Sequence, residues 1–315
     1  MVSSMSMKSI KTKQFQPLTD EGRVWDFMVE VYAEDWSNGV PAPFFEYAIA
    51  SAWLDKNYLF ANRLWLDGDR IVAFAFYENP CTDVFVSLRP GYEALADEIV
   101  EYGETQMPRF DGQKAFVLFP GQTALIEVVK RRGYAIAHEE TDHVFDFETG
   151  KLDYPLPQGF HVVNPSGCEP EKLARCFWRG FGNDEREPFE NWADRVAGDD
   201  WTAQRSYYGV LGETLAPPPH ATYDHNVIIA DETGEYACFS GMWWVPENRL
   251  AYMEPLCTVP EHRGKGLAAA ALSMHVRRLR PLGARLMTGG GSPFYSHIGY
   301  SREIHWQHWE KEQTT

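Results

Sequence analysis

The sequence predicts a mixed α/β protein built from two halves of similar organisation. Helical and strand patterns alternate along the chain, and their order repeats after about 150 residues. The length of 315 residues also exceeds that of one common domain. Helices placed between strands in this order fit a mixed sheet better than a helical bundle or a β-sandwich.

The first half shows a regular succession of elements. Apolar residues at helical spacing predict a helix at residues 20–32, with an inner face formed by Val24, Phe27, Met28 and Val31. Further helices are predicted at residues 44–54, 91–106 and 123–132, and strands at 59–66, 70–77, 83–88, 114–119 and 143–147. The turn Asp67-Gly68-Asp69 joins the first two strands, and Gly133 ends the last helix.

The second half repeats this order. Strands are predicted at residues 160–163, 227–231, 236–244, 249–258, 284–288 and 302–309, and helices at 169–180, 266–282 and 293–297. Gly133-Tyr134 in the first half and Gly299-Tyr300 in the second each close a helix and open the final strand. This pairing favours an internal duplication over two unrelated α/β domains.

A break in the pattern divides the halves. Residues 152–159, LDYPLPQG, contain two prolines and a glycine, which is typical of a linker. We therefore expect a domain at residues 1–150, a linker at 151–159 and a second domain at 160–315.

Composition narrows the possible partners and the compartment. The chain has 29 Lys and Arg residues and 45 Asp and Glu residues, which gives a net charge of −16. Nucleic acid is therefore not expected as a partner, whereas a cationic small molecule is compatible with this charge. The five cysteines form no C-x-x-C pair, and the histidines lack metal-ligand spacing, so no metal or disulfide framework is expected. No long apolar run or signal-like segment occurs, which predicts a cytoplasmic protein without membrane contact.

The stretch from Leu256 to Ala269 carries the most informative pattern. A predicted strand, Leu256, Cys257 and Thr258, leads to a basic loop that contains Arg263, Gly264, Lys265 and Gly266. The loop opens a helix that begins with Leu267, Ala268 and Ala269. Glycines allow close backbone approach, and a helix start presents unpaired N–H groups, so this stretch predicts a pyrophosphate-binding loop.

Three known motifs were weighed for this loop. A Walker A motif does not match, because Gly266 follows Lys265 and the required upstream glycine is absent. A dinucleotide-binding fingerprint does not match either, because it requires an acidic residue about 20 positions after the loop and the sequence has none there. The third, R-x-x-G-x-A, is spelled by Arg263, Gly266 and Ala268. Here the sequence resembles the GNAT superfamily of acetyl-CoA-dependent N-acetyltransferases. A second stretch, Phe294 to Tyr300, is similar to the late F/L-Y-x-x-x-G-F/Y motif of that family.

The resemblance implies two tandem GNAT-like domains, of which only the second keeps the acetyl-CoA motif. In the first half, residues 88–92 lack R-x-x-G-x-G/A, and Val129 stands where the second half has Tyr295. The resemblance further implies acetyl-CoA as cosubstrate, held by the backbone of residues 256–258 and by the glycine loop. The Asn that the family often has before its late helix is replaced here by residues 288–291, TGGG.

Acetyl transfer to an amine by direct attack requires a base and benefits from an acid. Glu254, just before the loop strand, is the candidate base, and Tyr295 is the candidate acid. A covalent route through Cys257 lacks a base partner. The small amine acceptor is expected to meet Trp178, Phe181 and Trp243, although aromatics at these spacings are more often core residues. The alternative function is a non-catalytic protein that binds or senses acyl-CoA on the same scaffold.

Overall fold

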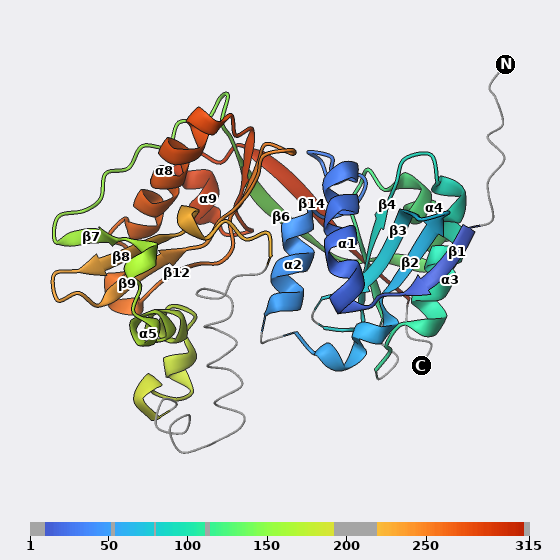
Figure 1. Cartoon of the computed structure of the whole chain (residues 1–315), viewed down its shortest axis with the longest axis horizontal. Coiled ribbons are helices and arrows are strands. Elements are labelled where there is room, and N and C mark those ends of the chain that lie inside the picture. Colours follow the sequence, from blue (N-terminus) through green and yellow to red (C-terminus); the bar gives the residue numbers. More distant parts are fainter. Residues whose placement is uncertain (1–9, 52–53, 79, 111–113, 192–218, 312–315) are drawn as a thin grey trace. The chain divides into compact units, whose positions relative to one another are not determined.

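A computed structural model describes residues 10–51, 54–78, 80–110, 114–191 and 219–311 (Figure 1). The chain forms two compact units, each made of segments distant in sequence. Unit 1 comprises Met1–Ile49, Leu54–Thr141 and Ile304–Thr315, and unit 2 comprises Ala50–Trp53 and Asp142–Glu303. Strands β6 (Tyr134–Asp146) and β14 (Arg302–Lys311) each begin in one unit and end in the other.

Unit 1 is a sheet between two layers of helices. Its elements in chain order are β1 (Ile10–Gln14), α1 (Pro17–Val31), α2 (Ala42–Ala50), the 3-10 helix η1 (Lys56–Ala61), β2 (Arg63–Asp67), β3 (Arg70–Tyr77), β4 (Asp83–Leu88), the 3-10 helix η2 (Glu93–Leu95), α3 (Ala96–Gln106), β5 (Ala115–Leu118) and α4 (Thr123–Arg131). The strands lie in the order β1-β2-β3-β4-β5-β14. β4 and β5 are parallel, whereas the other pairs are antiparallel.

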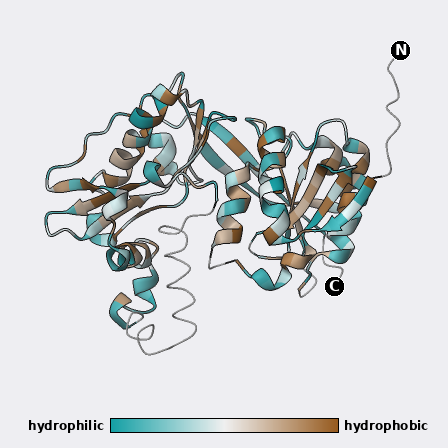
Figure 2. Cartoon of the chain, viewed as in Figure 1, coloured by the Kyte–Doolittle hydropathy of each residue, from teal (hydrophilic) through white to brown (hydrophobic). Residues whose placement is uncertain are grey.

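The two faces of the unit 1 sheet follow from alternation along β3. Phe74 and Phe76 point to one face, where both rings pack within 5.0 Å of Phe45 on α2. Ala73 and Ala75 point to the other face and join the core formed with α3 and α4. Figure 2 shows hydrophobic residues gathered on β3 and β4, while the covering helices carry residues of both kinds.

The last strand of the chain completes the unit 1 sheet. β14 pairs antiparallel with β5, with Trp309 opposite Phe116 and Gln307 opposite Leu118. Trp309 is buried in the same core as Phe116, and the ring of Trp306 packs 5.3 Å from that of Trp36. The predicted linker at residues 151–159 divides the sequence into two halves, and this division stays a prediction. The two compact units have other boundaries, because β14 lies in the second half of the sequence but mostly belongs to unit 1.

Unit 2 contains two groups of strands. Its further elements are β7 (Phe160–Val163), the 3-10 helix η3 (Pro165–Gly167), α5 (Pro170–Gly180), the 3-10 helices η4 (Asn183–Glu185) and η5 (Tyr223–His225), β8 (Val227–Asp231), β9 (Tyr236–Ser240), β10 (Trp243–Val245), β11 (Leu250–Tyr252), β12 (Leu256–Thr258), the 3-10 helix η6 (Pro260–His262), α8 (Leu267–Leu279), the 3-10 helix η7 (Arg280–Leu282), β13 (Leu286–Thr288) and α9 (Pro293–Ile298). One group runs in the order β6-β13-β11-β10, and the other in the order β12-β9-β8-β7.

Strand β9 is packed on both faces by helices. The ring of Phe239 lies 4.9 Å from that of Phe177 on α5. The next residue, Ser240, points the other way, where its hydroxyl lies 3.0 Å from Nε2 of His275 on α8. Burial lowers the pKa of His275 to about 3, so this imidazole is neutral inside the protein.

Most predicted elements are confirmed, and several boundaries are wrong. The predicted strand at residues 59–66 begins with the 3-10 helix η1, and the strand itself starts at Arg63. The final strand of the first half starts at Tyr134, well before the predicted residue 143. The predicted strand at residues 236–244 is interrupted between Ser240 and Trp243. The short polar strand β1 was not predicted.

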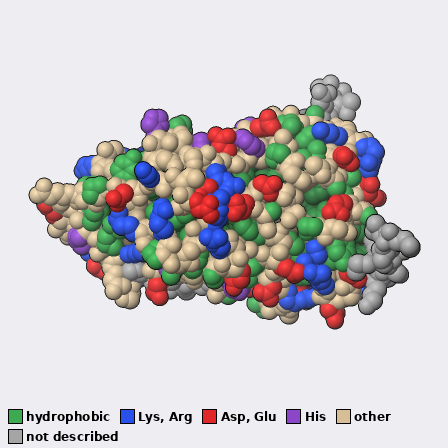
Figure 3. Space-filling model, turned by 90° about the horizontal axis from the view of Figure 1, so that it is seen from above, with side chains coloured by type: hydrophobic (Ala, Val, Ile, Leu, Met, Phe, Trp, Pro, Cys, Tyr) green, Lys and Arg blue, Asp and Glu red, His purple; other side chains and the backbone are tan. Residues whose placement is uncertain are grey.

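Charges of both signs lie side by side on the surface. On the face shown in Figure 3, Lys and Arg side chains alternate with Asp and Glu side chains. On this face, acidic residues are therefore mixed with basic residues. Within the described ranges, every helix is too short or too polar to cross a membrane.

The placement of β14 in unit 1 predicts the effect of a substitution near the carboxyl end of the chain. Trp309→Ala should lower the free energy of unfolding by about 3–5 kcal/mol, because a buried aromatic side chain is removed from the unit 1 core. Urea unfolding followed by circular dichroism measures this. Glu310→Ala, an exposed change on the same strand, is the control and should cost below about 0.5 kcal/mol. Equal effects of the two variants would show that the strand does not pack there.

Candidate active site

The centre of the site is a break in the strand predicted at residues 249–258. The structure divides it into β11, which pairs parallel with β13, and β12, which pairs antiparallel with β9. Prediction of one continuous strand was wrong, because Met253, Glu254 and Pro255 lie between the two segments and the Glu254–Pro255 peptide bond is cis. The break places the half-buried Glu254 where the two strands diverge.

Close packing holds the break in position. The backbone N–H of Met253 donates to Oγ1 of Thr288 at the end of β13, at 2.7 Å. On the other side, the N–H of Gly241 donates to the carbonyl of Pro255 at 2.9 Å. A Cβ atom at Gly241 would lie 2.1 Å from the carbonyl oxygen of Glu254, so only glycine fits there.

Strand β12 is the edge strand of its group. An edge strand presents backbone N–H and C=O groups on its outer side, as β-strand-like binding of a ligand requires. Cys257 in its middle is buried, and its Sγ lies 3.9 Å from the carbonyl oxygen of Cys176. A Cβ at Gly180 would lie 2.8 Å from that Sγ. Cys257 is thus a packing residue, as expected for a small side chain on this strand.

The basic loop contains two glycines in the left-handed region and leads directly into α8. Gly264 and Gly266 adopt φ angles of +74° and +85°, a region that favours glycine. A Cβ at either position would meet nothing within 4 Å, so the space beside both glycines is open. Gly266 is the N-cap of α8 and has no side chain to bond the first-turn N–H groups of Leu267, Ala268 and Ala269. Such a helix start can bind an anion, and the binding of a phosphate by these residues stays a prediction.

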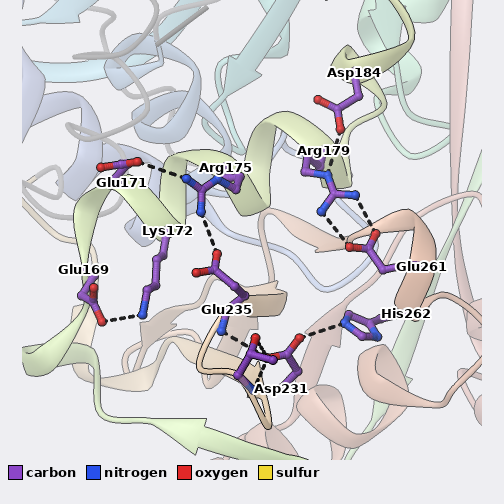
Figure 4. A network of polar contacts seen from close by, with 11 residues as sticks. Glu169, Glu171, Lys172, Arg175, Arg179, Asp184, Asp231, Glu235, Glu261 and His262 are labelled. Atoms are coloured by element: carbon purple, nitrogen blue, oxygen red, sulfur yellow. Dashed lines mark hydrogen bonds and ion pairs between the residues drawn. The ribbon is translucent and has the colours of Figure 1, made fainter. Parts of the chain in front are cut away.

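An ion-pair network fixes the loop to the rest of unit 2 (Figure 4). Arg179 on α5 donates to both carboxylate oxygens of Glu261, at 2.7 and 2.9 Å, and to Asp184 at 2.8 Å. Burial alone would raise the pKa of Glu261, but backbone hydrogen bonding and Arg179 outweigh it and lower the pKa. A bidentate pair of this kind orients the loop as well as stabilising it.

A second contact orders the lysine of the loop. Nζ of Lys265 lies 2.9 Å from Nδ1 of His262, whose Nε2 lies 3.3 Å from Oδ2 of Asp231. An ammonium group only donates, so Nδ1 accepts and Nε2 carries the proton that faces Asp231. Burial would raise the pKa of Asp231, but hydrogen bonds from Thr233, Glu235 and His262 hold it low. Asp231 therefore stays charged and fixes the histidine.

Arg263 also stabilises the loop, through two hydrogen bonds to backbone carbonyls. Its Nε donates to the carbonyl of Thr258 at 3.1 Å, and its Nη2 donates to the carbonyl of Gly180 at 2.9 Å. The guanidinium thus links the end of β12 to the end of α5. Because Arg263 remains exposed, its charge also adds to the potential of the loop.

Tyr295 is almost wholly buried near the strand break. It lies on α9, which Ser292 caps by accepting from the N–H of Phe294 at 3.3 Å. Its ring packs against Phe294 and Tyr300 at 5.2 and 5.1 Å. A Cβ at Gly290 would lie 3.3 Å from this ring, so the glycines after β13 make room for it.

The surroundings of Tyr295 keep its hydroxyl protonated. Burial raises the pKa of this hydroxyl above its ordinary value, and the charges of Glu254 and Asp142 raise it further. A tyrosine in this state is a proton donor over the whole physiological range. The candidate base and acid predicted from the sequence therefore act on one another electrostatically.

The predicted acceptor residues lie on two different elements. Trp178, on α5, donates from Nε1 to the carbonyl of Glu187 at 2.7 Å. Phe181 follows α5 and is 51% exposed, while its ring lies 5.8 Å from Phe177. Trp243, on β10, is buried opposite Tyr252. Their role in acceptor binding stays a prediction.

A separate cavity of about 410 Å³ borders the loop. Its described lining includes Arg175, Arg179, Glu235 and His262, most of which belong to the network of Figure 4. Among the described lining residues, neither Glu254 nor Tyr295 occurs. The cavity therefore lies apart from the candidate acid and base.

Sequence reasoning missed the residues that support the site. The Arg179–Glu261 pair joins residues far apart in the chain, so no local pattern reveals it. Gly241 stood inside a predicted strand, where an isolated glycine is a signal for close backbone approach. Asp142 directly precedes the predicted strand at residues 143–147, and nothing in its local sequence marks it as a neighbour of Tyr295.

Comparison with known proteins identifies the class. Residues 181–291 match the model of the Acetyltransferase (GNAT) family. A tandem GNAT protein from the clavulanic acid biosynthesis pathway has a similar structure, with a TM-score of 0.55, 13% identity and coverage of 96% of this chain and 98% of that chain. An acetyltransferase of the GNAT family from Colwellia psychrerythraea has a TM-score of 0.53 and 11% identity, covering 96% of this chain and all 100% of the other. No curated protein matches the chain in sequence.

The chain therefore contains a GNAT acetyltransferase domain, and its fold is that of tandem GNAT proteins. At such low identities the structural likeness shows the fold alone. The family match includes β12, the glycine loop and α8, so the part of the chain with the predicted acetyl-CoA motif lies inside the matched region.

The bracing contacts of Arg263 predict a loss of cosubstrate affinity on substitution. Arg263→Ala should weaken CoA binding by about 1–3 kcal/mol, because a charged hydrogen-bond partner of the loop is lost. Calorimetric titration with CoA measures this. Arg277→Ala, which removes an exposed arginine paired with Asp153, is the control and should bind CoA normally. Equal affinity in both variants would remove Arg263 from the site.

Proposed function

We propose that the chain is an acetyl-CoA-dependent N-acetyltransferase with one active site, in unit 2. It transfers an acetyl group to a small amine by direct attack in a ternary complex. The observation that carries the proposal is the open glycine loop at the uncapped start of α8, which follows the strand break that contains Glu254. A protein that only binds acyl-CoA needs the loop but neither the carboxylate nor the buried hydroxyl.

The residues present fit acetyl-CoA at one end of the site. Leu267, Ala268 and Ala269 offer backbone N–H groups to a pyrophosphate, and Gly264 and Gly266 leave room for it. Arg263 and Lys265 add positive charge beside them. The outer edge of residues 256–258 is suited to the amide groups of the pantetheine, as the family resemblance implies. Acetyl-CoA, when bound, supplies an acyl group activated as a thioester.

At the other end of the site, Glu254 and Tyr295 transfer protons. Glu254 takes a proton from the ammonium group of the acceptor, which frees the nitrogen lone pair for attack. Tyr295 gives its hydroxyl proton to the departing sulfur. The raised pKa of Tyr295 ensures that this proton is present at neutral pH. Base and acid are therefore separate groups that lie on different elements of unit 2.

In unit 1, a side chain bridges the backbone just beyond the last paired residues of the parallel strands β4 and β5. Gln122 accepts from the N–H of Phe119 after β5 and donates to the carbonyl of Val86 on β4, at 3.1 and 2.8 Å. The carbonyl of Asn38 accepts from the N–H of Leu88 at 2.9 Å. These bonds use backbone groups that a pantetheine would need.

The basic residue of the corresponding unit 1 loop has a structural partner. Arg89 is buried and donates to both oxygens of Glu30, at 2.6 and 2.8 Å. Arg89, helped by Arg70, lowers the pKa of Glu30 to about 2. Since its charge is already balanced, Arg89 is poorly placed to bind a phosphate. These contacts support the prediction that the half at residues 1–150 has no cofactor site.

Thiol release from acetyl-CoA tests the proposed activity. The full chain is incubated with acetyl-CoA and a panel of small amines, and free CoA is measured with a thiol reagent. Amine-dependent release supports an acetyltransferase. Tight CoA binding without release across the panel would instead favour the non-catalytic alternative.

The proposed acid role predicts a large effect of a small change. Tyr295→Phe should lower kcat by about 10²–10⁴, the usual contribution of a positioned acid, because the ring stays and only the proton donor is lost. CoA affinity should barely change. Tyr300→Phe is a matched control, because among the described residues its buried hydroxyl has no hydrogen-bond partner. Near-full kcat in Tyr295→Phe would make this tyrosine a packing residue.

The pH profile gives an independent check on the same hydroxyl. Because burial and two carboxylates raise its pKa, Tyr295 loses its proton only above pH ~10, the ordinary range for tyrosine. The alkaline fall in kcat due to this group should therefore lie above that pH, and Tyr295→Phe should lack it.

The internal contacts of Gln122 and Arg89 in unit 1 predict the stoichiometry. Calorimetry of the full chain should give one CoA bound per chain. Arg89→Ala should leave this number and the affinity unchanged, whereas Arg263→Ala should weaken the single site. Two equivalent sites would contradict the assignment to unit 2.

A further inference from the structure

In unit 1, β14 lies beside β6, which brings together residues that are distant in sequence. Nε2 of Gln307 donates to Oε1 of Glu139 at 3.0 Å. Two residues along each strand, Oγ1 of Thr141 lies 3.1 Å from Nδ1 of His305. One strand is followed forward and the other backward between these contacts, so they indicate an antiparallel register in this part of the sheet.

Two histidines and a glutamate meet on one face of this strand pair. In the antiparallel register His138 lies opposite His308, and opposite residues have Cβ atoms about 4.5–5.5 Å apart. The ring centroids of these two histidines are 5.3 Å apart. Glu140 follows His138 by two residues and therefore shares its face. Oε1 of Glu140 lies 2.8 Å from Nε2 of His138 and 3.7 Å from Nε2 of His308, so one carboxylate oxygen approaches both imidazoles.

The spacing of these three atoms is close to that of ligands around a zinc ion. Histidine nitrogens and carboxylate oxygens lie about 2.0–2.2 Å from zinc, so two such ligands of a tetrahedral ion are roughly 3.3 Å apart. The two oxygen–nitrogen distances, 2.8 and 3.7 Å, lie on either side of this value. The side chain of His138 is 58% exposed, so its ring can turn toward an ion without disturbing the core.

The second ring nitrogen of His308 faces another carboxylate. Nδ1 of His308 lies 3.9 Å from Oδ2 of Asp83 on β4, and both side chains are mostly buried. In metal sites, a ligating histidine usually directs its other ring nitrogen to a carboxylate or carbonyl, which fixes the ring and makes the ligand more basic. His308 therefore has one nitrogen directed to the cluster and the other to a supporting residue.

The charges around the cluster favour a cation. Glu140 and Asp83 approach His308 from its two sides, at 3.7 and 3.9 Å. Ala115 on β5 is opposite Asp83 on one side and opposite Glu310 on the other, so the three side chains form a row on one face. A cation bound by the imidazoles is attracted by all three carboxylates.

We propose that Nε2 of His138, Nε2 of His308 and a carboxylate oxygen of Glu140 form a site for a divalent transition metal, and that Zn²⁺ is the ion that fits it best. Imidazole nitrogens suit zinc, whereas magnesium and calcium prefer oxygen ligands. Three protein ligands leave the fourth tetrahedral position to water. The bound ion links β6 to β14. Local spacing does not reveal the site, because one ligand comes from a distant part of the chain.

Zinc titration of the full chain, prepared without a polyhistidine tag, tests the site. By calorimetry, His138→Asn/His308→Asn should bind one Zn²⁺ ion fewer per chain than the wild type, because both imidazole ligands are lost. The comparison with the wild type removes any contribution from other zinc-binding groups. Circular dichroism checks that the variant is folded. Equal numbers of bound ions in the two proteins would overturn the inference.

Single variants separate ligands from supporting residues. Asp83→Asn removes only the supporting carboxylate and should weaken zinc binding about 10- to 100-fold. His138→Asn and Glu140→Gln each remove a ligand and should weaken it further; both side chains are more than half exposed, so these changes leave the fold intact. His161→Asn, at an exposed position on β7 in unit 2, is the matched control and should bind zinc like the wild type. A loss of equal size in this control would show zinc binding to surface histidines in general and would contradict the assignment.

Selectivity and stabilisation give a second readout. An excess of Mg²⁺ should leave the zinc bound, because magnesium disfavours imidazole ligands. Zinc should raise the thermal midpoint of the wild type, and a chelator should reverse the rise, since an ion that binds only the folded chain stabilises it. His138→Asn/His308→Asn should lack this shift. Displacement of zinc by magnesium, or an equal shift in the double variant, would refute the proposal. These measurements need neither CoA nor an amine, so they succeed or fail independently of the proposed acetyl transfer.

Discussion

The arrangement of the site depends on one constraint: a strand segment cannot pair with β13 and turn toward β9 at the same time. At Met253–Pro255 the chain leaves β13 and joins β9, and the two groups of strands separate there. The separation creates the outer edge of β12 and places Glu254 at the junction. Gly241 is needed because the backbone of Glu254 comes closer than a Cβ allows, and Gly289 because the backbone of His143 and the ring of Tyr295 do so.

The sequence predicted the local parts of this arrangement and missed the non-local ones. The glycine loop could be predicted because its parts are adjacent in sequence. The two glycines that adopt positive φ angles and the uncapped helix start lie within one short stretch. The break at Glu254 was missed because apolar residues continue on both sides of it, as in one uninterrupted strand. Asp142 was missed because its neighbours depend on which strand β6 joins, and pairing partners leave no local signal.

Charge is used differently around the two ends of the site. At the loop, acidic residues serve as structural partners: Glu261 holds Arg179, and Asp231 holds His262. This leaves the cationic loop oriented within a chain of net charge −16. At the strand break, burial raises the pKa of the Tyr295 hydroxyl, and the charges of Glu254 and Asp142 raise it further. Acidic residues therefore fix the geometry at the loop and favour the protonated hydroxyl at the break.

The position of β14 has a consequence for how the protein is made. Ala115 pairs with Glu310, so the unit 1 sheet lacks a strand until residue 310 has left the ribosome. Pairing over such a sequence distance requires closure of a very long loop and is slow. Until then the exposed edge of β5 is open to pairing with another nascent chain. Synthesis therefore passes through a stage in which this edge of β5 is unpaired, whereas β14 covers it in the folded protein.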